Sequence, residues 1–191
     1  MPVFLQILLT ELAAVTLDNV ILTAAIGTST LIECAKSPRH LLSFGFFITE
    51  FSVLSSYIAY FAEARLVSRT ERLFVPSIYI LCLGLVYVLT LVIMRIISKK
   101  HFALLKKYVH LSAFNCAVLG CIFINGEREA ALPDRLIYAA EVGVGFMLAT
   151  YLLAINYKKL SNDDVPASFR GFPASLLYIG ILAMIVYGLK I

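Results

Sequence analysis

Long apolar stretches, separated by short polar segments, dominate the pattern of this chain. Six of them are close to the ~20 residues that a helix needs to cross ~30 Å of hydrocarbon. They cover residues 3–27, 41–63, 74–96, 106–125, 135–156 and 172–189. The polar segments between them are too short to fold alone. The pattern therefore predicts an all-α integral membrane protein, with one domain of six transmembrane helices over residues 1–191.

Composition agrees with this interpretation and excludes several classes of protein. Hydrophobic residues make up 61% of the chain and charged residues 15%, whereas soluble domains average about 45–50% and about 25%. The net charge of +4 comes from basic residues between apolar stretches, not from a basic stripe that could follow a nucleic acid. The sequence contains no phosphate loop, dinucleotide fingerprint or nucleophile elbow. We therefore expect no NADH or flavin site on this chain.

The basic residues predict an orientation in the membrane. Ten of the 16 Lys and Arg residues lie in or beside the segments after spans one, three and five, among them Lys36, Lys99 and Lys158. The other six lie on the opposite side of the predicted membrane. Because cytoplasmic segments carry the excess of positive charge, this distribution predicts that both termini face outward.

Two asparagines suggest an internal repeat. Asn19 in span one and Asn115 in span four are 96 positions apart, about half the chain, and each is followed by a glycine, Gly27 or Gly120. One interpretation is a coincidence between two apolar stretches. The other is a 3+3 inverted repeat with broken half-helices in spans one and four, whose unwound ends build a site near the bilayer midplane.

Two motifs in the C-terminal half carry a family resemblance. The segment 112–120, Ser-Ala-Phe-Asn-Cys-Ala-Val-Leu-Gly, resembles the Asn-Cys-Ala-Val-Leu-Gly signature of the Rnf/Nqr membrane subunits. The loop 164–171, Asp-Val-Pro-Ala-Ser-Phe-Arg-Gly, resembles a loop of the A-type member of Rnf and the E-type member of Nqr, with Ser168 in place of a proline. The resemblance is clear over residues 102–190 and thin over 1–100.

The resemblance implies a place in a larger assembly. Members of this family are subunits of Na⁺- or H⁺-translocating NADH or ferredoxin oxidoreductases in the inner membrane of prokaryotic cells. We therefore expect this chain to help electrons cross the bilayer, without being catalytic by itself. The implied partners are a paralogous six-helix subunit of opposite topology and the other subunits of the complex, some of which would contact the loop 164–171.

The resemblance also implies an iron centre, for which this sequence is only partly equipped. In the family each of two paralogues gives one cysteine from its first helix and one from its fourth to a centre of the [2Fe–2S] type. Cys116 matches the fourth-helix ligand, and Asn115 would shape its half-helix; the alternative is a buried, inert thiol. Ser29 stands where the first-helix cysteine is expected, and serine is a poor substitute for a thiolate. Cys34 and Cys121 do not replace it, so the chain holds either an altered centre or none.

Carboxylates inside the predicted spans are candidates for ion coupling. Glu50 and Glu141 lie deepest, whereas Glu11 lies near a helix end and Asp18 near Asn19. Ionisable groups are costly in lipid and mark ion or proton pathways by default. The alternative is a protonated carboxyl group that is hydrogen-bonded to a neighbouring helix or subunit.

Three functional hypotheses follow from these observations. The first is a membrane subunit that passes electrons through Cys116 while an ion moves. The second is a scaffold subunit of the same kind of complex without a cofactor, which Ser29 favours. The third is a stand-alone carrier for ions or small solutes that uses Glu50 or Glu141.

Overall fold

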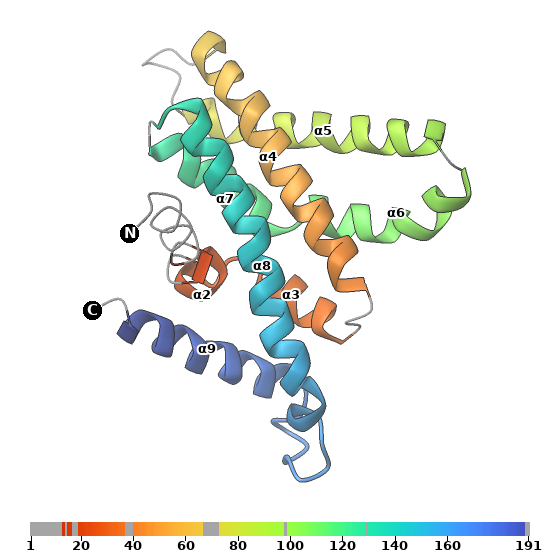
Figure 1. Ribbon diagram of the computed structural model, residues 1–191, viewed down its shortest axis with the longest axis vertical. Helices are drawn as coiled ribbons and strands as arrows, with labels where there is room; N and C mark the ends of the chain where they lie inside the picture. Colours follow the sequence, from red (N-terminus) through yellow and green to blue (C-terminus); the bar gives the residue numbers. More distant parts are fainter. Residues whose placement is uncertain are drawn as a thin grey trace, which may run out of the picture. The chain divides into compact units, whose positions relative to one another are not determined.

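The computed structural model describes residues 13, 15–16, 19–36, 40–66, 73–97, 99–128 and 130–189, and within those ranges the regular structure is helical. The helices appear along the chain in Figure 1. Their bounds are α2 Val20–Ala24, α3 Thr28–Ala35, α4 Leu41–Leu66, α5 Val75–Ile97, α6 Lys99–Ala113, α7 Cys116–Glu127, α8 Leu132–Leu160 and α9 Phe172–Leu189.

Five helical segments of the described residues are long and apolar enough to cross a membrane. They are Leu41–Arg65, Val75–Ile97, Leu105–Glu127, Leu132–Leu160 and Phe172–Leu189. Each agrees with one of the last five predicted spans to within a few residues, because hydrocarbon thickness fixes the length of an apolar helix. The chain is therefore helical, with several helices of membrane-spanning length.

The predicted first span, 3–27, lies mostly outside the described residues. Its described part differs from the prediction, since helix α3 continues to Ala35 after a break. Ala25 and Gly27 both have positive φ, 55° and 86°, and this left-handed backbone ends α2 before α3 begins. Glycine adopts such a φ without strain, so Gly27 sits where the chain needs it.

The chain divides into two compact units that do not coincide with its two halves. Unit 1 comprises residues 1–45 and 144–191, and unit 2 comprises residues 46–143. The division falls within the two long helices, α4 and α8.

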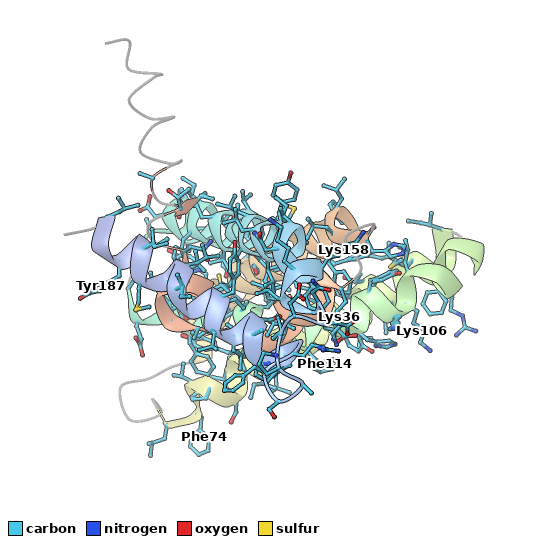
Figure 2. The ribbon with its side chains drawn as sticks, turned by 90° about the horizontal axis from the view of Figure 1, so that it is seen from below. Lys36, Phe74, Lys106, Phe114, Lys158 and Tyr187 are labelled. Atoms are coloured by element: carbon cyan, nitrogen blue, oxygen red, sulfur yellow. The ribbon has the colours of Figure 1, made fainter. Side chains whose placement is uncertain are left out.

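Unit 1 contains α2, α3, α9 and most of α8. Helix α9 packs against both α2 and α3, beside which it runs in Figure 1. Figure 2 shows Tyr187 near one end of α9, with Lys36 and Lys158 together toward the other end. Lys36 donates to Glu33 at 2.7 Å, and this contact raises the pKa of Lys36. Lys36, just after α3, and Lys158, in the last turn of α8, therefore lie at the same end of unit 1.

Unit 2 contains most of α4, all of α5, α6 and α7, and the start of α8. Helix α5 packs along α6 and also contacts α7, and Figure 1 shows α5 and α6 side by side. The apolar residues of its core include Ile48, Phe51, Val109 and Val118, which are fully buried. A Cβ at Gly143 would collide with Thr49, so this glycine allows α8 to approach α4 closely.

Candidate functional site

The helix of the predicted fourth span is interrupted at Phe114 and Asn115. Helix α6 ends at Ala113 and α7 begins at Cys116. The Asn115 side chain caps α7, because its Oδ1 accepts from the backbone N–H of Ala117 at 3.0 Å. Its backbone carbonyl accepts from Val118 at 3.1 Å. An asparagine cap of this kind satisfies N–H groups that a helix start leaves unpaired, so the break costs little.

Contacts between α5 and α6 hold the interruption in place. A hydrogen bond joins the Tyr87 hydroxyl to Nδ1 of His110, one turn before the break. The ring of Tyr87 also lies 5.2 Å from that of Phe114, whose side chain is 72% exposed and is labelled in Figure 2. The backbone N–H groups of Phe114 and Asn115 still bond to His110 and Ser112. The segment is therefore an ordered joint between two half-helices.

Cys116 and Asn115 differ sharply in exposure although they are adjacent. Cys116 is exposed at the first position of α7. Asn115 is only 1% exposed, and its Nδ2 has no hydrogen-bond partner. This position therefore presents an accessible sulfur beside a buried, unused N–H donor.

Unit 1 has a corresponding break that begins with Asn19. The Oδ1 of Asn19 accepts from the backbone N–H of Ile21 at 3.0 Å and so caps the short helix α2. Its Nδ2 donates to the carbonyl of Gly145 at 2.9 Å. Ser29, the residue in the place of the expected cysteine, is exposed in the first turn of α3. The other three cysteines of the chain, Cys34, Cys82 and Cys121, are all buried.

The residues at these breaks fit the implied iron centre only in part. Cys116 offers one thiolate, which is the usual ligand of iron–sulfur clusters, and Asn115 offers an N–H donor that could bond to a cluster sulfur. Ser29 offers a hard hydroxyl oxygen instead of a second thiolate. Within the described ranges, His, Cys, Asp and Glu side chains form no group of three that could hold a metal ion. A centre at Cys116 would therefore need ligands from beyond the described residues.

Two of the predicted intramembrane carboxylates lie within the described residues. Glu50 is half-buried on α4, and Thr90 of α5 donates to its Oε1 at 3.1 Å. Glu141 is half-buried on α8. Glu11 and Asp18 lie outside the described residues. The alternative interpretation of Glu50, a carboxyl group hydrogen-bonded to a neighbouring helix, requires a contact such as this bond from Thr90.

Sequence reasoning missed an ion pair at the other end of unit 2. Arg135 Nη1 lies 2.9 Å from Glu63 Oε2, and the two side chains are 6% and 20% exposed. Tyr79 donates to the other Glu63 oxygen at 2.6 Å. These three residues line a cavity of about 1000 Å³. Both charges stand at the ends of predicted spans, where charge usually marks a membrane boundary, so no pattern along the chain indicated their pairing.

The loop between α8 and α9 is fixed by one arginine. Arg170 donates to the Asp163 carboxylate at 2.8 Å and to the Asp163 carbonyl at 3.1 Å. It also donates to the carbonyl of Val165 at 3.2 Å. Phe169, beside the arginine, is 56% exposed. The loop that the resemblance singled out therefore presents an apolar ring from a braced backbone.

Comparison with known proteins identifies relatives over nearly the whole chain. A family model described as Rnf-Nqr subunit, membrane protein, matches residues 7–191. The A-type member of the ion-translocating oxidoreductase complex of Actinobacillus pleuropneumoniae is 26% identical over 173 residues, which are 90% of each chain. Its counterpart in the Na⁺-translocating ferredoxin:NAD⁺ oxidoreductase complex of Acetobacterium woodii is 26% identical over 178 residues, 93% of each chain. The counterpart in Vibrio vulnificus is 24% identical over 184 residues, 96% of each.

Proposed function

Because this chain belongs to the Rnf-Nqr family of membrane subunits, we propose that it is the A-type membrane subunit of an ion-translocating oxidoreductase complex. The match over residues 7–191 carries the proposal, together with relatives of nearly equal length that are named as the A-type members of such complexes. The capped interruption before Cys116 supports it, because a helix break in lipid must be buried in protein or line a cavity.

The redox part of this function belongs to Cys116. Its exposed thiol would provide one ligand to a [2Fe–2S]-type centre at the interface with a paralogous subunit of opposite topology. When bound, such a centre carries one electron. Asn115 fixes the start of α7 and so sets the position of the sulfur. The partner's thiolates would have to complete the centre, since Ser29 supplies none.

We propose a six-span chain in the inner membrane of a prokaryotic cell, built as a 3+3 inverted repeat with both termini outside. The two asparagine caps support the repeat, because Asn19 and Asn115 accept the same kind of bond, from the N–H two residues ahead, at 3.0 Å. The positions of Lys36 and Lys158 support the orientation, since both would lie on the cytoplasmic side.

The proposed orientation in the membrane also suggests residues for ion coupling and for contact with other subunits. Glu50 and Glu141 are the proposed ion-coupling carboxylates, and the bond from Thr90 to Glu50 would hold one of them in a fixed orientation. The braced loop with Phe169 would contact the cytoplasmic subunits of the complex, because an exposed aromatic ring on a rigid backbone binds with little loss of entropy.

The replacement Cys116→Ala, made in the assembled complex, tests the redox role. We expect loss of the electron paramagnetic resonance signal of the membrane centre, loss of the corresponding iron, and loss of electron transfer. Cys121→Ala is the matched control, because this buried thiol lies on the same helix away from the exposed position. Iron content and turnover that survive Cys116→Ala would show that Cys116 has no redox role.

Ser29 favours a second candidate, a member of the same complex that holds no cofactor. The same experiment separates the two, because a scaffold without a cofactor would assemble and support turnover equally well with Ala at position 116. The stand-alone carrier makes a different prediction, solute uptake by vesicles that contain this chain alone. Failure to copurify with flavin-bearing subunits would contradict both forms of the proposed function.

A further inference from the structure

Unpartnered polar atoms are concentrated in unit 2. The described residues contain six buried side-chain N or O atoms without a hydrogen-bond partner, and five of them lie in this unit. These five are Ser52 Oγ, Ser55 Oγ, Ser112 Oγ, Asn115 Nδ2 and Asn125 Oδ1. Each of the five residues is at most 2% exposed. A buried polar atom without a partner costs about 1–3 kcal/mol, so such a concentration calls for an explanation.

Two fully buried hydroxyl groups in helices of unit 1 behave differently, although the Ser161 hydroxyl of the same unit is the sixth unpartnered atom. Thr150 donates to the carbonyl of Phe146 at 2.7 Å, and Ser175 donates to that of Gly171 at 2.8 Å. This bond to the preceding turn is the usual solution for a hydroxyl in an apolar helix. The Ser52 and Ser55 hydroxyls are equally buried but make no such bond. Close helix packing explains small residues there, but not hydroxyl oxygens left without partners.

A chain of contacts connects these side chains to the cavity. Asn125 Nδ2 donates to Ser56 Oγ at 3.1 Å and to the backbone carbonyl of Arg135 at 3.0 Å. Cys121, one turn earlier on α7, lies beside Ser52 and Ser56. Arg135 and Glu63 line the cavity. Ser56 of α4 and Asn125 of α7 are therefore connected by hydrogen bonds to Arg135 in the lining of the cavity.

The same side chains lead toward the interruption. A helix rises 1.5 Å per residue, so Asn125 and Asn115 are about 15 Å apart along α7, about half the thickness of the hydrocarbon. We call the set Ser52, Ser55, Ser56, Ser112, Asn115 and Asn125 the polar column. Asn125 marks its end at the cavity and Asn115 its end at the break in the helix, and all of its members belong to unit 2.

We infer that the polar column is a half-channel through which a partly dehydrated Na⁺ ion passes between the cavity and the interruption at Asn115. The inference rests on the proposed function, which requires an ion to move. The hydroxyl oxygens of the column and Oδ1 of Asn125 are ligands for hard cations and can replace part of a hydration shell. The free Nδ2 of Asn115 is an N–H donor, so it marks the end of the path and does not bind the ion. Because these oxygens are neutral, they bind the ion weakly enough to release it, as conduction requires.

The ion pair at the cavity lies at the entry to this path. The Glu63 carboxylate, which lines the cavity together with Glu127, accepts from both Arg135 and Tyr79. An entering cation must compete with the Arg135 guanidinium for that carboxylate.

The double replacement Ser52→Ala/Ser55→Ala tests the half-channel in the assembled complex in proteoliposomes. Alanine keeps the close packing and removes two oxygens. We expect Na⁺ uptake per transferred electron to fall several-fold, while the resonance signal of the membrane centre and electron transfer in ionophore-treated vesicles stay unchanged. Ser175→Ala is the matched control, because it removes a buried hydroxyl from unit 1, and it should leave uptake unchanged.

The possible outcomes separate this inference from the proposed function. Unchanged Na⁺ uptake in the double variant would overturn the half-channel alone. So would proton uptake without Na⁺ uptake in the wild-type complex, measured with and without a protonophore. A wild-type chain that neither assembles with the other subunits nor supports electron transfer would overturn the proposed function and the half-channel with it.

Discussion

Asn19 in unit 1 and Asn115 in unit 2 begin their helices in the same way and differ in what the rest of the side chain does. Each Oδ1 accepts from the backbone N–H two residues ahead at 3.0 Å. The Nδ2 of Asn19 is bonded to Gly145, whereas that of Asn115 has no partner although Asn115 is 1% exposed. One break is thus closed by a neighbouring helix, and the other keeps a donor free.

The residues that follow the two asparagines also differ, in this case in their exposure. Val20, after Asn19, is buried, and Cys116, after Asn115, is exposed. The asparagine cap therefore explains how a helix can break within a membrane, but not what the break is for. The groups around each asparagine decide its role. At Asn19 the carbonyl of Gly145 binds the side chain, so the break is a structural joint. At Asn115 an accessible thiol lies beside an unbonded N–H donor, so the break could bind a ligand.

Replacement of Asn19 by Ala should have the largest effect of the changes that test this comparison. It removes a cap worth about 1 kcal/mol and a buried hydrogen bond worth about 1–2 kcal/mol, so the free energy of unfolding should fall by about 2–3 kcal/mol. Denaturant titration of the full chain in mixed micelles measures the loss. A loss below about 1 kcal/mol would mean that the bond to Gly145 adds nothing to the cap.

Replacement of Asn115 by Ala should cost less, because removal of the buried, unpartnered Nδ2 offsets part of the lost cap. The expected decrease in the free energy of unfolding is at most about 1 kcal/mol, measured in the same micelles. The variant also removes the free Nδ2, so the resonance signal of a membrane centre should change although Cys116 remains. Equal losses for the two asparagine variants would show that the two breaks are energetically alike and that the comparison does not hold.

Replacement of Ser29 by Cys should have the smallest effect on stability. The side chain is exposed in the first turn of α3, so the free energy of unfolding should change by no more than about 0.5 kcal/mol. If position 29 faces the same centre as position 116, the added thiolate should raise the iron retained by the purified complex. Exposed residues of α3 such as Glu33 provide the control, because Glu33→Cys adds a thiol elsewhere on the same helix.

Much of the helical architecture could be predicted from the sequence. Apolar stretches predicted the last five spans because the membrane sets their length, and the Asn-Cys pair indicated the break before Cys116. The end of the first span could not be found in this way. Hydropathy does not register the positive φ at Gly27, after which α3 continues to Ala35.

The polar interior of unit 2 was harder to predict. Glu63 and Arg135 are 72 residues apart in the sequence, and only the packing of α4 and α8 brings them together. Ser52, Ser55 and Asn125 are ordinary residues of an apolar helix when taken one at a time. Their missing hydrogen bonds are a property of the fold, so no window of the sequence shows them.

The arginine that braces the loop after α8 has a consequence for movement within unit 1. Arg170 holds both Asp163 and Val165, and Asn156 of α8 donates to the Tyr178 hydroxyl of α9 at 2.8 Å. A hairpin joined at its bend and along its arms cannot absorb a displacement by flexing. A protein that binds at Phe169 and displaces the loop would therefore move α8 and α9 together.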